Sequence, residues 1–271
     1  MGLQDERSVA TEDALERAST DIAQVIPHGD LTTTAYERIE ELFVATRIQP
    51  GATLRTQDLQ ALTGLGRTPV HQAVRRLAAE TLLDVQPRNG LRVSPVDLAR
   101  ERRLAGLRLS MDRFVVDAVI SGMEGNERAR LHHLMRRLED ERNGITLDRF
   151  NVLDKAFDRL MIEASRERFL DRSLRPLKAL GRRAGFLDIT HISGPKGLDE
   201  TVGDHLAIMH AVLDGDVARA RAASDRVVQS GLEMLDRLER NIDPALLDVS
   251  FGLGDEAGRK GQPARTPRGG P

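Results

Sequence analysis

The sequence contains no cysteine, and aromatic residues make up only 3% of its 271 residues. Without cysteine there is neither a disulfide framework nor a thiolate metal site, which fits a cytoplasmic protein. The shortage of aromatic side chains argues against a binder that stacks the bases of single-stranded nucleic acid on aromatic rings. The fold must therefore be stabilised mainly by the packing of aliphatic side chains, without disulfide bonds.

Long apolar runs and a strong net charge are also missing. No segment approaches the roughly 18–20 apolar residues of a membrane span, so we expect no membrane partner. The N-terminus lacks the basic stretch and apolar core of a signal peptide. A formal net charge of −2, with 40% hydrophobic and 30% charged residues, indicates a globular chain of two domains. Any contact with DNA must therefore come from a local basic patch.

The N-terminal third shows three helical periods after a polar arm, which we place at residues 1–30 and expect to be flexible. The first helix begins near Thr34, the second spans about 56–63, and the third runs to about Glu80. Thr68 is expected to cap the third helix, with Pro69 at its first helical position. The apolar faces that predict these helices comprise Tyr36, Ile39, Leu42 and Phe43, then Leu59 and Leu62, then Val70, Ala73, Val74 and Leu77.

A β-hairpin is predicted directly after the third helix. Two short extended runs, 82–86 and 91–94, flank a turn that contains Asn89-Gly90, which is a strong hairpin signal. Three helices followed by a hairpin predict a winged helix-turn-helix over residues 31–95.

Residues 96–242 show only helical periodicity, so we predict an all-α bundle of about six helices. The fold class is therefore mainly α, with one small β-hairpin. Residues 243–271 are expected to form a disordered tail because their C-terminal part is rich in Gly, Pro and Arg. The predicted helices of the bundle lie near residues 97–121, 126–142, 147–165, 167–190, 199–214 and 216–240.

The third helix carries the pattern expected of a DNA-reading element. No acidic residue lies between Asp58 and Glu80, so nothing on this segment repels a phosphate backbone, and Arg67, Arg75 and Arg76 add positive charge. Its polar face can enter a major groove while the hairpin tip touches an adjacent groove or phosphate. The alternative is a solvated basic surface helix. The residues expected to face DNA are Arg67, Thr68, His71, Gln72 and Arg75 on the helix, and Arg88, Asn89 and Gly90 on the hairpin.

The run Gly66-Arg67-Thr68-Pro69-Val70, with Ala73, Leu77 and the closing Gly90-Leu91-Arg92-Val93, resembles the GntR superfamily of bacterial transcription factors. The sequence departs from the family pattern at His71, where Arg is usual, and at Gln72, where Glu is usual. The resemblance implies a homodimer that binds double-stranded palindromic DNA, with Arg67 and His71 reading bases or phosphates.

The helical half resembles the FCD branch of that superfamily, through Asp154, Phe157-Asp158, His205 and Leu213-Asp214-Gly215-Asp216. The resemblance implies a small-molecule effector, an organic or sugar acid, that controls operator binding. It also implies that Arg108 on the first bundle helix grips an effector carboxylate. The expected function is transcriptional regulation, with repression favoured.

The same resemblance implies a divalent metal held by an Asp, a His four residues later and two further histidines. Here Asp158 stands at the first histidine position and Val227 at the last, so the site is altered. Asp154, Asp158 and His205 remain candidates for Mg²⁺ or Mn²⁺, and a metal-free pocket remains open. With a metal, a carboxylate effector would bind through it. Without one, the two carboxylates favour a polyhydroxylated or cationic effector.

Two other functions stay open at this stage. One is an all-helical metal-dependent enzyme that uses Asp154, Asp158 and His205, although no catalytic motif supports it and we assign no catalytic residue. The other is a DNA-packaging protein without an effector. Asp154 and Asp158 also have a purely structural interpretation, because their neighbours Lys155 and Arg159 suggest a solvated helix face.

Overall fold

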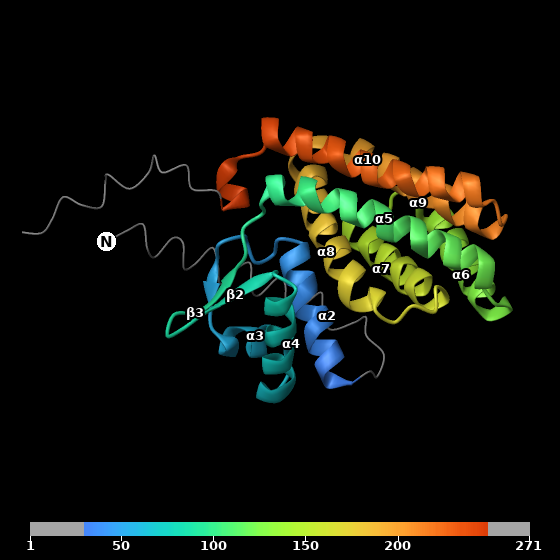
Figure 1. Ribbon diagram of the computed structural model, residues 1–271. Coiled ribbons are helices and arrows are strands. Elements are labelled where there is room, and N and C mark those ends of the chain that lie inside the picture. Colours follow the sequence, from blue (N-terminus) through green and yellow to red (C-terminus); the bar gives the residue numbers. More distant parts are fainter. Residues whose placement is uncertain (1–29, 249–271) are drawn as a thin grey trace, which may run out of the picture.

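The computed structural model describes residues 30–248, which form a small winged domain below a layer of long helices (Figure 1). The winged domain contains three helices and a three-stranded antiparallel sheet in the order β1-β3-β2. Its elements are α2 (Leu31–Val44), β1 (Thr53–Leu54), α3 (Thr56–Thr63), α4 (Arg67–Ala79), β2 (Leu83–Gln86) and β3 (Gly90–Val93). The predicted winged helix-turn-helix is therefore confirmed in type and order.

Helix α4 begins two residues earlier than the sequence pattern predicts. The Val70 amide bonds to the Gly66 carbonyl at 3.4 Å, which makes Gly66 the N-cap and corrects the expected cap at Thr68. Pro69 then lies inside the first turn, where backbone N–H groups have no partner within the helix, so its missing N–H costs nothing. The turn before α4 uses Gly64 in the left-handed region, at φ +65°.

The wing is a hairpin in which Gln86 pairs with Gly90. Gly90 has φ +89°, and a Cβ at this position would lie 2.7 Å from the Leu54 carbonyl oxygen of β1. This close approach is sufficient to require a glycine at position 90. Strand β1 was not predicted, because two residues are too few to show an alternating pattern.

The rest of the described chain is helical, and six long helices run between residues 98 and 241. These are α5 (Leu98–Gly122), α6 (Gly125–Glu141), α7 (Leu147–Ala164), α8 (Leu170–Asp188), α9 (Gly194–Leu213) and α10 (Val217–Asn241). The break expected around Ser193 is instead one π-helical turn, Ile189–Ser193, that leads directly into α9. No helix among residues 30–248 is long and apolar enough to cross a membrane.

The last described residues pack beside the segment that joins the two domains. Pro244–Leu247 form a 3-10 helix with Leu247 buried, and the Val96 amide bonds to the Leu247 carbonyl at 3.0 Å. The tail expected from residue 243 is therefore structured at its start, because Leu247 covers the segment that joins the two domains. The proposed arm of residues 1–29 and the tail from 249 lie outside the described residues.

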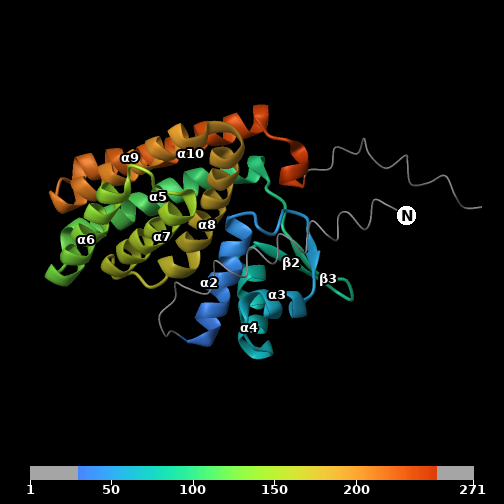
Figure 2. The same ribbon diagram turned by 180° about the vertical axis from the view of Figure 1, so that it is seen from behind.

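The two domains share an apolar core. Figures 1 and 2, two opposite views, place α2 beside α8. Ala179 and Leu180 of α8 pack into the same cluster as Tyr36, Ile39 and Phe43 of α2. Burying this surface favours one relative placement of the domains, since separating them would expose it to water.

A buried carboxylate lies in this interface. Glu40 of α2 is wholly inaccessible to solvent, lies 2.5 Å from Lys155 Nζ of α7, and accepts a 2.8 Å hydrogen bond from the Tyr36 hydroxyl. Burial by itself would raise the pKa of Glu40, but Lys155, Arg182 and Arg175 outweigh burial and lower that pKa to about 2. The interface therefore contains a charged glutamate at neutral pH.

This charge predicts a specific acid sensitivity. The folded pKa of Glu40 lies below that of an unfolded glutamate, about 4.3, so its stabilising effect is complete above that pH and lost as the pH falls toward 2. We expect Glu40→Gln to lower the free energy of unfolding at pH 7 by on the order of 2–3 kcal/mol, with the difference shrinking between about pH 5 and pH 2.

Denaturant titrations of both chains at each pH measure this. Glu163→Gln is the control, since Glu163 forms only an exposed ion pair with Arg130 and should change stability by less than about 1 kcal/mol. A difference between wild type and Glu40→Gln that stays constant from pH 7 to pH 2 would contradict the prediction.

Candidate DNA-reading face and ligand pocket

Helix α4 presents the predicted polar face to solvent. Its inner side chains, Val70, Ala73, Val74 and Leu77, are buried in the winged domain. The outer side chains, Arg67, Thr68, His71, Gln72 and Arg75, are all exposed. Gln72 also accepts a 2.7 Å hydrogen bond from the Thr32 hydroxyl of α2, which restrains its amide. This face carries hydrogen-bond donors and positive charge and no carboxylate.

Arg76 does not belong to that face, although the sequence groups it with Arg67 and Arg75. Its guanidinium lies 4.0 Å from the centre of the Tyr36 ring, and its Nε donates to Glu80 at 2.8 Å. The Tyr36 hydroxyl oxygen also lies 2.5 Å from Glu80 Oε2, so its single proton lies between the carboxylates of Glu40 and Glu80. Arg76 therefore anchors α4 to α2.

The wing places Arg88 and Asn89 at its exposed tip, in the turn that precedes β3. Arg88 has φ +68°, a conformation stabilised by the tight turn in which the Asn89 amide bonds to the Gln86 carbonyl. Gly90 is half-buried and has the structural role described above. Arg88 and Asn89 are thus the wing side chains free to reach a ligand.

The helical domain contains a cavity of about 410 Å³, a size suited to a small metabolite. Its walls come from α5, α7, α8, α9 and α10. All four effector residues suggested by the sequence, Arg108, Asp154, Asp158 and His205, line this cavity, as does Val227. They meet although they come from three different helices.

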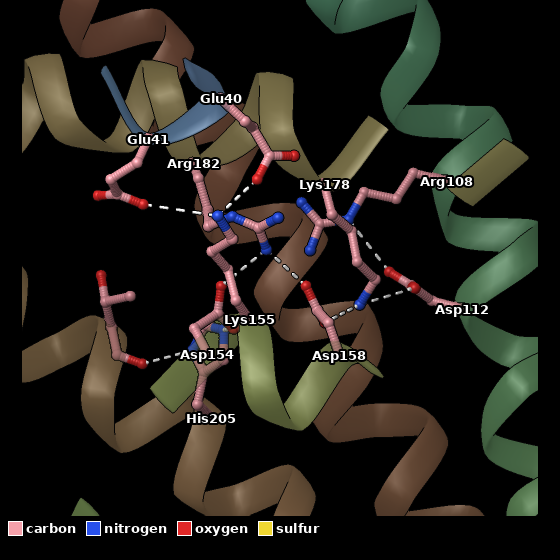
Figure 3. A network of polar contacts seen from close by, with 11 residues as sticks. Glu40, Glu41, Arg108, Asp112, Asp154, Lys155, Asp158, Lys178, Arg182 and His205 are labelled. Carbon is pink, nitrogen blue, oxygen red and sulfur yellow. Dashed lines mark hydrogen bonds and ion pairs between the residues drawn. The ribbon is translucent and has the colours of Figure 1, made fainter. Parts of the chain in front are cut away.

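Two cations that the sequence did not single out lie between these residues (Figure 3). Lys178 Nζ lies 2.5 Å from Asp158 Oδ1 and 3.4 Å from Asp112 Oδ1. Arg182 Nη1 lies 2.6 Å from Asp158 Oδ2 and 3.2 Å from Asp154 Oδ2. Lys178 and Arg182 are four residues apart and so lie on one face of α8.

The contacts form a chain of alternating charge along the cavity. One end is Arg108, whose Nε donates to Asp112 at 3.1 Å, and the other is His205, whose Nε2 lies 3.0 Å from Asp154 Oδ1. We name these seven residues the ionic floor. In order, they are Arg108, Asp112, Lys178, Asp158, Arg182, Asp154 and His205.

His205 is charged in this arrangement. Its Nδ1 faces the Thr201 carbonyl oxygen at 2.8 Å and its Nε2 faces the Asp154 carboxylate, so both ring nitrogens must donate. Burial alone would lower the pKa of His205, but Asp154 outweighs burial and raises it. The pKa of Asp154 is lowered in turn, because His205 and Arg182 overcome the effect of burial.

The residues present do not fit the divalent metal that the resemblance implies. A doubly protonated His205 has no free lone pair, both Asp158 oxygens are bonded to Lys178 and Arg182, and Val227 supplies no donor. No cluster of three His, Asp or Glu side chains suited to a metal occurs among residues 30–248. Lys178 and Arg182 place positive charge directly beside Asp154 and Asp158.

Sequence reasoning missed Asp112, Lys178, Arg182 and Asn151. The first three carry the ion pairs of the floor, but in an arginine-rich chain the sequence does not distinguish a buried cation from an exposed one. Asn151 lines the cavity and is 2% exposed, and its Nδ2 has no hydrogen-bond partner among the described residues. Arg182 Nε is buried without such a partner too.

Two family models match this chain. The model for bacterial regulatory proteins, gntR family, matches residues 31–93, and the FCD domain model matches residues 103–230. The first match covers the winged domain, and the second covers α5 to α9 and half of α10.

Relatives cover most of the chain. An uncharacterized HTH-type transcriptional regulator in an unstable DNA locus of Streptomyces ambofaciens is 28% identical over 203 residues, 75% of this chain and 84% of that protein. The HTH-type transcriptional repressor RspR of Escherichia coli strain K12 is 24% identical over 224 residues, 81% of this chain and 93% of that protein.

Among solved structures, Escherichia coli McbR/YncC superposes with a TM-score of 0.68 at 18% identity, covering 78% of this chain and all of that chain. A protein of Rhodococcus sp. RHA1, named a putative transcriptional regulator GntR, superposes with a TM-score of 0.58 at 15% identity, covering 76% of this chain and 97% of that chain. These structures share the fold. The matched families and relatives are transcriptional regulators and not enzymes, so the metal-enzyme alternative is set aside. The chain belongs to the GntR family of bacterial regulatory proteins, as a helix-turn-helix transcriptional regulator with an FCD domain.

Proposed function

We propose that this regulator binds a palindromic operator as a homodimer and acts as a repressor that a small organic or sugar acid releases from DNA. The single observation that carries the proposal is the cavity of the helical domain, whose ionic floor adjoins the buried ion pair between the two domains. RspR of Escherichia coli, a relative over most of the chain, is named a repressor.

Recognition of DNA is assigned to the exposed face of α4 and to the wing tip. Arg67 stands at the helix N-terminus, where a guanidinium reaches a guanine edge in the major groove, and Arg75 lies two turns later, toward the backbone. Thr68, His71 and Gln72 complete the groove-facing set, and Arg88, Asn89 and the Gly90 turn form the wing contact.

Coupling between ligand and DNA follows a short route through the interface. Asp154 of the cavity is adjacent in α7 to Lys155, which pairs with Glu40 of α2. From Glu40, hydrogen bonds of Tyr36 reach Glu80, to which Arg76 of α4 is anchored. A ligand that moves α7 relative to α8 changes the position of α2 against the helical domain, and therefore the orientation of α4.

We expect Arg67→Ala and Arg75→Ala to weaken DNA binding in different ways. Arg67→Ala should lower affinity for the operator by roughly 1–3 kcal/mol and relax base preference at one position, because a bidentate base contact is lost. Arg75→Ala should weaken binding to all sequences alike and reduce the salt slope by about one unit, because a phosphate contact is lost.

Binding titrations at several salt concentrations, on an operator selected from random DNA, separate the two effects. Arg103→Ala is the matched control, since Arg103 is an exposed arginine of α5, away from α4. Equal loss of specificity from both α4 variants would show that the division of roles is wrong.

We also expect a homodimer with two-fold symmetric DNA contacts. One recognition helix covers only a few base pairs, so specific affinity requires two copies on a palindrome. Sedimentation analysis with operator DNA should give two chains per site, and footprinting should protect both half-sites. A monomer that protects a single half-site at micromolar concentration would refute the dimer.

A further inference from the structure

The ionic floor holds a guanidinium where the resemblance implies a metal ion. Arg182 Nη1 bonds to both Asp154 and Asp158, and Lys178 takes the remaining oxygen of Asp158. Lys178 Nζ lies 2.5 Å from Asp158 Oδ1 and 3.4 Å from Asp112 Oδ1, so its ammonium faces two carboxylates. Both cations belong to the polypeptide, and neither can be removed by a chelator.

We propose that Lys178 and Arg182 are the resident cations of this cavity, and that its ligand is a small monocarboxylate bound directly by N–H donors. This inference rests on the proposed effector role of the cavity and specifies the ligand class and the mode of binding. It replaces recognition through a metal by recognition through the chain's own guanidinium and amide groups.

The first argument is the pairing within the ionic floor. Arg182 Nη1 contacts both Asp154 and Asp158, and Lys178 Nζ contacts both Asp158 and Asp112. The carboxylates of the floor therefore already face cations of the polypeptide, which take the place of a metal ion. Guanidinium groups recognise carboxylates through paired N–H donors, and Arg108 and Arg182 both line the cavity.

The second argument is the set of donors without acceptors. Asn151 Nδ2 and Arg182 Nε are buried and have no partner among residues 30–248, and both residues line the cavity. A buried donor without an acceptor is destabilising, so a ligand that supplies oxygen acceptors binds favourably there. Arg108, on the facing helix, donates its Nε to Asp112, and its guanidinium edge faces Gly181 of α8. The unpaired groups of Asn151 and Arg182 are both donors, and the guanidinium of Arg108 is donor-only, which matches a carboxylate.

The third argument comes from Glu101, which lies at the other end of the cavity wall from Arg108. Glu101 lies on α5 seven residues before Arg108, roughly 10 Å along the helix, and also lines the cavity. Burial raises the pKa of Glu101 to about 7. A carboxyl group here accepts hydrogen bonds from ligand hydroxyls and disfavours a second ligand carboxylate. The favoured ligand therefore has one carboxylate and a hydroxylated remainder.

The metal half of the proposal is tested on full-length protein purified without a His-tag. We expect elemental analysis to find no stoichiometric divalent metal, and we expect EDTA to leave the melting temperature unchanged. Calorimetry with Mn²⁺ or Zn²⁺ alone should detect no stoichiometric binding in the cavity. A bound metal at one per chain, or a melting temperature lowered by EDTA and restored by Mn²⁺, would overturn the proposal.

The ligand half is tested with four probes in the presence of EDTA: D-gluconate, its dicarboxylate D-glucarate, its neutral analogue D-glucitol, and acetate as the minimal carboxylate. Gluconate should raise the melting temperature by several degrees at saturation, and acetate by less at higher concentration. Glucitol and glucarate should have little effect. If neither gluconate nor acetate stabilises the protein, or if stabilisation requires a metal, direct carboxylate binding is refuted.

Asn151→Leu separates ligand binding from a structural role. The substitution removes a donor that has no partner, so the melting temperature of the free protein should stay the same or rise, while gluconate affinity falls about tenfold or more. Arg108→Ala should weaken gluconate binding at least as much, and Arg103→Ala on the same helix should not weaken it. Unchanged gluconate affinity in both Asn151→Leu and Arg108→Ala would place the ligand elsewhere and overturn the assignment.

These outcomes are independent of the DNA-binding assignment. Loss of operator binding in Arg67→Ala without any response to carboxylates would refute this inference and leave the regulator intact. Carboxylate binding that never changes operator affinity would refute effector control and leave the direct binding mode intact.

Discussion

Glu40 brings a negative charge into the dry interface between α2 and the helical domain, and the seating of the two domains depends on its neutralisation by Lys155. A shared apolar cluster supplies contact area, but apolar contact tolerates sliding. A buried carboxylate does not, because any shift that separates it from its cation leaves an unpaired charge. The ion pair therefore makes the relative position of the two domains a discrete state.

The ionic floor extends the same constraint into the cavity. Its charges alternate in sign, so each group has a partner on either side or lies at one end of the chain. Such a network is stable only when its members are matched, yet Arg182 Nε of the floor and Asn151 Nδ2 beside it are buried without a partner among residues 30–248. Both residues line the cavity. The cavity and the domain interface thus share two helices, α7 and α8. A change at the floor bears directly on the residues that hold α2.

A few residues on the inner side of α4 connect this helix to the interface between the two domains. Arg76 points away from the basic face and stacks on the Tyr36 ring. Arg76 and Tyr36 both contact Glu80, and Tyr36 and Lys155 both contact Glu40. Helix α4 therefore packs, through Arg76, on the aromatic ring that also contacts the interface carboxylate. A chain with a single tyrosine places it at this junction.

Local signals in the sequence were sufficient for the helices, the hairpin and the exposed face of α4, because helical periodicity and an Asn-Gly turn act over a few residues. They also brought Arg108, Asp154, Asp158 and His205 forward as one set, through the family resemblance. The partners of these residues were decided only by the tertiary structure. Lys178 and Arg182 lie 20 and 24 residues from Asp158 and look like any other cation of an arginine-rich helix. Only the packing of α7 against α8 buries them beside the carboxylates, and burial turns an ordinary surface charge into an obligatory partner.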